Sequence, residues 1–143
     1  MTPTLRGRWQ TRVLLLGTVG LVVSFIVGLA LGDLLTPLAL LGYVLLLGFG
    51  WDILYHYLQS WRWDRDWPPA FQLAGAMGEG LLIWGLVQIS RVVAANLPGV
   101  AETLTTPQFV VHYGTVWFMM FLGTQGPLRV LFPRWRYRGG EWW

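Results

Sequence analysis

Lysine and cysteine are both absent from this chain of 143 residues, and charge of either sign is scarce. All ten basic residues are arginine, so no lysine Schiff base to retinal or pyridoxal phosphate can form. The absence of cysteine excludes disulfides, iron–sulfur clusters, thiolate zinc sites and covalent c-type haem. Charged residues make up 12% of the chain, about half of the roughly 25% that is usual in soluble proteins.

The missing charge is concentrated in four long apolar stretches. Each is close to the roughly 20 helical residues needed to cross about 30 Å of hydrocarbon. The stretches show no sustained alternation of polar and apolar residues, which argues against membrane strands. We therefore predict an all-α fold: a polytopic membrane protein with four transmembrane helices in a single domain. The predicted spans cover residues 13–31, 37–58, 69–95 and 108–126.

The first apolar stretch follows three arginines, as the core of a secretory signal peptide also would. Its length of about twenty residues exceeds the roughly 7–15 residues of such a core. We therefore expect it to be a retained membrane span.

The arginines are distributed very unevenly between the segments that flank the predicted spans. Positive residues collect on the cytoplasmic side of membrane proteins, so this distribution predicts that both termini are cytoplasmic. The expected location is the cell membrane, meaning a bacterial inner membrane or an equivalent internal membrane. Arg91 alone falls on the outer side, and the inner side holds Arg6, Arg8, Arg12, Arg62, Arg65, Arg129, Arg134, Arg136 and Arg138.

Two inner segments combine arginine with aromatic residues. Residues 127–143 are predicted to form a basic and aromatic interfacial tail, and the connection after the second span is rich in tryptophan. Near a membrane surface each arginine attracts anionic lipid headgroups by about 1 kcal/mol. RNA-binding surfaces use the same residue types, but attachment to a membrane makes lipid the simpler partner, and we expect no nucleic acid. The arginines of this lipid or partner surface are Arg62, Arg65, Arg134, Arg136 and Arg138.

Small residues recur every fourth position in the first span, at Gly20, Ser24, Gly28 and Gly32. Such a face lets two membrane helices approach closely. The partner is either another helix of the same chain or a neighbouring subunit, and the sequence leaves both open.

Two acidic residues, Asp52 and Glu79, lie inside the second and third predicted spans. Burying an ionised carboxylate in a membrane costs at least about 2.5–3.5 kcal/mol, so such residues are candidates for function. Tyr55, His56 and Gln59 share a helical face with Asp52, and the antiparallel third span brings Glu79 to a similar depth. One hypothesis is that Asp52 hydrogen-bonds His56 or a helix end and stabilises the bundle. The others are a proton or cation path, or a site for a partner or cofactor.

Neither histidine nor acid patterns identify a cofactor or a catalytic site. His56 and His112 lie near opposite ends of their spans, so they are not expected to ligate one haem. A single histidine could ligate the magnesium of a pigment, but nothing in the sequence favours this possibility. Whether a pigment, haem or other cofactor is bound is left open by the sequence. The stretch from Gly48 to Asp52 is one residue longer than the Gly-x-Gly-Asp pattern of intramembrane aspartyl proteases, and the second acid is Glu79.

The leading functional hypothesis is a non-enzymatic role, and an enzymatic role ranks third. We expect no catalytic residue and no metal site. The small-residue face and the arginine–aromatic inner surface favour a small subunit or assembly factor of a larger membrane complex, or a homo-oligomer. The alternative is a proton or cation channel or transporter that uses Asp52 and Glu79.

Overall fold

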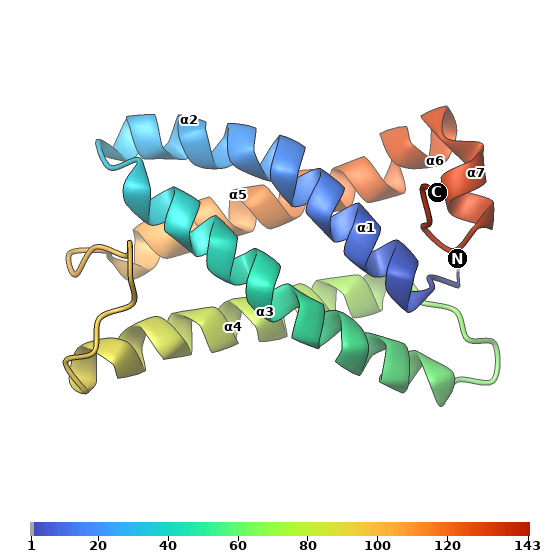
Figure 1. Cartoon of the computed structure of the whole chain (residues 1–143), viewed down its shortest axis with the longest axis horizontal. Helices are drawn as coiled ribbons and strands as arrows, with labels where there is room; N and C mark the ends of the chain where they lie inside the picture. The colour runs from blue at the N-terminus through green and yellow to red at the C-terminus, as the bar shows by residue number, and fades with distance from the viewer. Residues whose placement is uncertain (1) are drawn as a thin grey trace.

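The computed structural model describes residues 2–143, and within that range every regular element is helical. Four long helices form the body of the molecule, and two short helices follow them (Figure 1). The first long helix is continuous from Leu5 to Leu31 and contains one π-helical turn near its middle. The elements are α1 (Leu5–Leu15), the π turn η1 (Leu16–Gly20), α2 (Leu21–Leu31), α3 (Leu35–Ser60), α4 (Pro69–Val92), α5 (Thr106–Gln125), α6 (Pro127–Leu131) and α7 (Pro133–Tyr137).

Local chemistry fixes several of the helix ends. The Thr4 hydroxyl accepts a hydrogen bond from the Gly7 amide at 3.0 Å and caps α1. Gly32 ends α2 in the left-handed conformation, with φ of 71°, which glycine adopts without a steric penalty. At the start of α5, Thr105 and Gln108 form a reciprocal capping box. These caps satisfy amide and carbonyl groups that a helix end would otherwise leave unpaired.

Successive long helices run antiparallel in the bundle. Both termini and the connection formed by residues 61–68 lie at one end, here called the terminal end (Figure 1). The connections formed by residues 32–34 and 93–105 lie at the opposite end. The α1–α2 helix packs against α3 and α5, and α4 packs against α3 and α5 from the other side. The bundle is therefore a closed ring of four helices.

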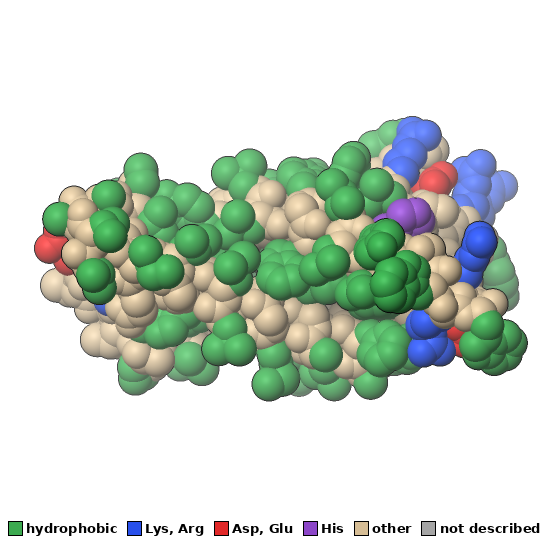
Figure 2. Space-filling model, turned by 90° about the horizontal axis from the view of Figure 1, so that it is seen from below, with side chains coloured by type: hydrophobic (Ala, Val, Ile, Leu, Met, Phe, Trp, Pro, Cys, Tyr) green, Lys and Arg blue, Asp and Glu red, His purple; other side chains and the backbone are tan. Residues whose placement is uncertain are grey.

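Three of these helices are long and apolar enough to cross a membrane. They are Leu5–Leu31, α3 and α4, with mean hydropathies of 2.6, 1.8 and 1.4. The fourth, α5, has 20 residues but includes Gln108, His112 and Gln125, which lower its hydropathy. Hydrophobic side chains extend along the visible face in Figure 2, and most of its arginines gather at the terminal end. This pattern indicates a helical membrane protein.

The first helix begins eight residues before the predicted span of 13–31, at Leu5. The three arginines expected to flank the membrane are therefore part of the helix itself. The other long helices cover 35–60, 69–92 and 106–125, each close to a predicted span. The early start follows from the Thr4 cap and from the contacts that Arg8 and Arg12 make inside the bundle.

The C-terminal residues fold back onto α1 instead of extending along a surface. Trp135 is only 4% exposed and packs with Leu15 and Leu128. Its indole nitrogen donates a hydrogen bond to the Thr11 hydroxyl at 2.8 Å, and the Thr11 hydroxyl donates to the Gly140 carbonyl at 3.1 Å. The aromatic side chain that was predicted to lie at an interface is thus part of a small core. The neighbouring arginines Arg134, Arg136 and Arg138 point outward and are exposed.

The main apolar core occupies the middle of the bundle and the half remote from the termini. It joins side chains of all four long helices with one from the connection before α5. The members are Leu16, Leu40, Leu41, Val44, Ile83, Val87, Leu104, Phe109 and Val116. The buried carboxylates Asp52 and Glu79 lie toward the other half, where the candidate site is found.

Candidate functional site

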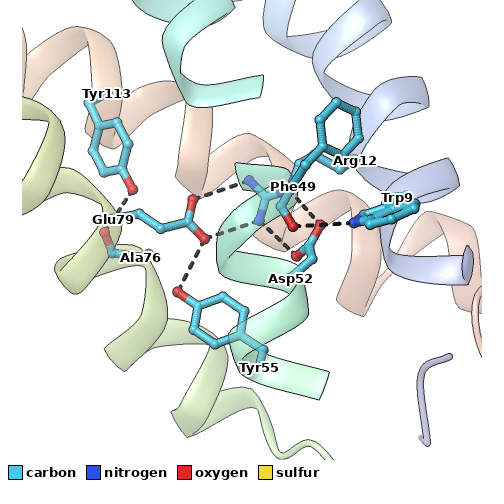
Figure 3. Close-up of polar contacts among 8 residues, drawn as sticks. All are labelled: Trp9, Arg12, Phe49, Asp52, Tyr55, Ala76, Glu79 and Tyr113. Atoms are coloured by element: carbon cyan, nitrogen blue, oxygen red, sulfur yellow. Dashed lines mark hydrogen bonds and ion pairs between the residues drawn. The ribbon is translucent and has the colours of Figure 1, made fainter. Parts of the chain in front are cut away.

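One arginine, Arg12, pairs with both of the predicted acids, Asp52 and Glu79. Its Nε and Nη2 atoms donate to the two oxygens of Asp52, each at 2.9 Å. Its Nη1 and Nη2 atoms donate to the two oxygens of Glu79, at 3.1 and 3.0 Å. Figure 3 shows the guanidinium between the two carboxylates. Because the three residues come from α1, α3 and α4, this ion-pair cluster joins three helices at one point.

The cluster is shielded from the surroundings. Asp52 is 4% exposed and Glu79 is 7% exposed. A buried ion pair needs good geometry and further hydrogen bonds to offset the loss of hydration. Bidentate pairing between a guanidinium and a carboxylate supplies that geometry. With two carboxylates and one guanidinium the cluster retains a formal charge of one negative unit, and the Tyr55 hydroxyl donates a further hydrogen bond to Glu79 at 3.1 Å.

Two glycines make room for these side chains. A Cβ atom on Gly48 of α3 would collide with the Arg12 guanidinium. A Cβ atom on Gly75 of α4 would lie 2.7 Å from the Tyr55 hydroxyl oxygen. The positions of the two glycines therefore set how closely α1 and α4 approach the polar side of α3.

Of the predicted polar cluster, Asp52, Tyr55, Gln59 and Glu79 are buried and face the interior. Gln59 lies nearer the terminal end, where it accepts a hydrogen bond from Arg8 at 2.8 Å and donates one to the Arg65 carbonyl at 2.7 Å. His56 differs from the prediction because its side chain is exposed on the outer surface of α3. The partner that Asp52 takes is Arg12 and not His56.

Sequence reasoning missed the central role of Arg12 because it treated this residue as a cytoplasmic flank. A signal was present: two acids at similar depth need a cation, and Arg12 directly adjoins the apolar stretch. Because the first helix begins at Leu5, Arg12 lies well inside it, where it meets Asp52 and Glu79.

The small-residue face points into the bundle. Gly20 faces α3, where an added Cβ would lie 2.9 Å from a leucine methyl group. Ser24 is fully buried, and its hydroxyl lies 2.8 Å from Nε2 of His112 on α5. Gly28 packs against the turn into α3, and Gly32 is the left-handed residue that ends α2. Gly20, Ser24 and Gly28 are thus occupied by contacts within the same molecule, whereas Gly32 is exposed and an added Cβ there would meet nothing within 4 Å.

The predicted arginine surface surrounds the terminal end. Arg62 pairs with Asp64 across the connection between α3 and α4, at 2.9 Å. Hydrogen bonding to the Arg62 guanidinium lowers the pKa of the Asp64 carboxyl. Arg65 is exposed and has a positive φ of 50°, which a turn residue can adopt at some cost. Together with the exposed arginines of the C-terminal segment, these residues leave this end strongly cationic.

Two spaces lie beside the ion-pair cluster. The first is a cavity of about 170 Å³ between α1, α3, α4, α5 and the C-terminal segment, lined by apolar as well as charged and amide side chains. It is here called the polar cavity because the ion-pair cluster forms part of its wall. The second is an apolar groove of about 450 Å³ between α3 and α4 on the outside of the bundle. Among residues 2–143, no three histidine, aspartate or glutamate side chains come together as a metal site would require. The arrangement offers hydrogen-bond donors and positive charge more readily than metal ligands.

Comparison with protein-family models, with curated proteins and with solved structures finds no match to this chain.

Proposed function

We propose that the chain crosses the membrane four times with both termini in the cytoplasm. Two observations support the fourth crossing. The 20 residues of α5 would span about 30 Å of hydrocarbon, and its polar residue His112 is buried against α2. Nine arginines belong to the terminal end and only Arg91 to the other, which supports a cytoplasmic terminal end.

We further propose a non-enzymatic role, as a small subunit or assembly factor of a membrane complex or as a homo-oligomer. The observation that carries this proposal is the engagement of both buried acids by Arg12. Because these carboxylates are used to join helices, the outer surface of the bundle is what remains for interaction with other molecules.

The outer face of α3 offers a specific place for a neighbouring membrane helix. Gly42 and Gly50 are exposed there, two turns apart, and a Cβ atom on either would meet nothing within 4 Å. Leu46 lies between them and is 66% exposed. Small residues on such a face let another helix approach closely in a membrane.

The association is tested by replacing both exposed glycines with leucine, since neither change creates an internal clash. We expect the native mass measured in mild detergent to fall to that of a single copy for Gly42→Leu/Gly50→Leu. The matched control is Gly85→Leu on α4, which is also free of contacts within 4 Å. The proposed role would be contradicted if the wild-type protein is monomeric in mild detergent and associates with no other protein in its own membrane.

The alternative role, a proton or cation path through Asp52 and Glu79, is less well supported by the geometry. The Arg12 guanidinium already engages the oxygens of both acids, so they are not free to bind an entering cation or proton. We therefore expect proton flux into liposomes to be negligible for the wild type, and unchanged by Asp52→Asn or Glu79→Gln. A large flux that either substitution abolishes would favour the channel.

A further inference from the structure

The polar cavity contains more positive charge than its own acids neutralise. Three arginines line it, Arg8, Arg12 and Arg129, against the two acids Asp52 and Glu79. Arg12 takes up both acids through four hydrogen bonds. Arg8 and Arg129 are therefore left facing the cavity without a carboxylate partner among the described residues.

The contacts of Arg8 and Arg129 show how incomplete their pairing is. The Nε atoms of both side chains are buried and have no hydrogen-bond partner. Arg8 bonds only the neutral amide of Gln59, at 2.8 Å, and its guanidinium lies 4.7 Å from the centre of the Trp67 ring. Both residues are half-buried, and a cation that is partly removed from water is normally paired, because otherwise it loses hydration without compensation. A group with negative charge in the cavity would supply that compensation.

Neutral hydrogen-bonding groups complete the wall between α4 and α5. Gln72 donates to the Thr124 hydroxyl at 3.3 Å and accepts from Gln125 at 3.0 Å. All three residues line the cavity. The cavity therefore combines two unpaired guanidinium groups with amides and a hydroxyl, which suits the oxygen atoms of a phosphate.

The apolar groove meets the polar cavity at Tyr55 and Trp67, which line both spaces. Their rings lie 5.3 Å apart. Beyond this pair the groove is lined by apolar and small residues, including Trp51, Leu54 and Gly78, and by one charged residue, Arg62. A polar site and an open, membrane-facing apolar groove thus adjoin each other at a single aromatic pair.

We propose that the cavity and the groove together bind one anionic phospholipid, with its phosphate between Arg8 and Arg129 and an acyl chain along α3 and α4. The positive charge of the cavity favours the anionic lipid headgroup, and the apolar lining of the groove favours the acyl chain. With the orientation proposed above, this lipid belongs to the cytoplasmic leaflet, which in many membranes is the anionic one. The site does not depend on the proposed association, because neither Gly42 nor Gly50 lines the cavity or the groove.

Native mass spectrometry of the delipidated full chain in a neutral detergent tests the site. Phosphatidylglycerol, phosphatidylcholine and inorganic phosphate are the probes. We expect one phosphatidylglycerol to bind in preference to phosphatidylcholine, with little competition from inorganic phosphate. Loss of a charged hydrogen-bonding partner weakens binding by about tenfold or more, so Arg8→Gln and Arg129→Gln should each have that effect. The exposed control Arg134→Gln should leave this tightest site unchanged.

A second variant tests the binding of the lipid's acyl chain separately from the binding of its headgroup. Gly78→Leu fills the groove, where a Cβ atom would make only ordinary contact with Trp51 at 3.8 Å, and it leaves every arginine in place. We expect it to weaken phosphatidylglycerol binding, whereas Gly85→Leu, outside the groove, should not. Equal binding of the two lipids, or retention of tight binding by both arginine variants, overturns the proposal. Full competition by inorganic phosphate together with no effect of Gly78→Leu would identify a free-anion site and overturn it as well.

Discussion

Replacing Arg12 with methionine gives the sharpest test of how the bundle is held together. Methionine keeps much of the length and the apolar stem of arginine but removes every donor. The substitution would leave the carboxylates of Asp52 and Glu79 buried without the four hydrogen bonds that now reach them. Only the Tyr55 hydroxyl would still donate to Glu79.

The expected loss is large. Removing one partner of a buried ion pair typically costs about 3–5 kcal/mol, because the remaining charge is uncompensated. Folded proteins are stabilised by only about 5–15 kcal/mol in total. We therefore expect Arg12→Met to lower the free energy of unfolding by about 3–5 kcal/mol.

Two further variants separate charge from geometry. The triple variant Arg12→Met/Asp52→Asn/Glu79→Gln contains no charge at this site and should recover most of the loss. Arg12→Lys keeps the positive charge but lacks the fork that binds both carboxylates at once, so its stability should lie between those of the wild type and Arg12→Met. The control Arg6→Met changes an exposed arginine and should stay within about 0.5 kcal/mol of the wild type.

The measurement is the loss of helical circular dichroism as a denaturing detergent is titrated into the protein in mild detergent micelles. The reasoning is refuted if Arg12→Met unfolds at the same point as Arg6→Met. It is also refuted if the triple variant is as unstable as Arg12→Met, since the cost would then come from packing and not from charge.

The other predictions concern orientation, the packing of α2 and the start of α3. Reporters fused after Trp143 and inserted between α4 and α5 should lie on opposite sides of the membrane; a shared side would refute the topology. Gly28→Leu crowds the turn into α3 and should lower the free energy of unfolding by about 1–3 kcal/mol, whereas an unchanged melting profile would contradict this packing. Asp33 accepts hydrogen bonds from Thr36 that lower its pKa, so its stabilising effect exists above its unfolded-state pKa and disappears as pH falls through the folded-state pKa. Thermal melts of wild type and Asp33→Ala should therefore differ at neutral pH, by about 1 kcal/mol, and converge in acid; a constant difference would contradict the assignment.

The helices themselves could be predicted from the sequence because they depend on local composition. Apolar stretches of sufficient length identified all four long helices to within a few residues at most ends. The start of the first helix was wrong by eight residues, because arginine was taken as a marker of the membrane boundary. The folding of the C-terminal segment onto α1 could not be predicted either, because the burial of Trp135 depends on contacts with residues more than a hundred positions earlier in the chain.

The candidate site was only partly predictable for the same physical reason. Helical spacing placed Asp52, Tyr55 and Gln59 on one face, and the hairpin of α3 and α4 brought Glu79 near them. Spacing within a helix could not show which side chain from α1 would fill the centre. It also included His56, which lies at the edge of that face and is exposed.

The separation of Arg12 from its partners in the chain has a consequence for biosynthesis. Asp52 follows Arg12 by 40 residues and Glu79 by 67 residues. At synthesis rates of about 5–20 residues per second, the second acid emerges roughly 3–13 seconds after the arginine. Until Asp52 has been made, the nascent first helix carries an unpaired cation, which is most stable at the hydrated headgroup level. The pairing then stays incomplete until Glu79 follows. With the membrane crossings proposed above, we expect the first helix to reach its final depth only after the third has been inserted. The segment that is synthesised first would then be among the last to reach its final position.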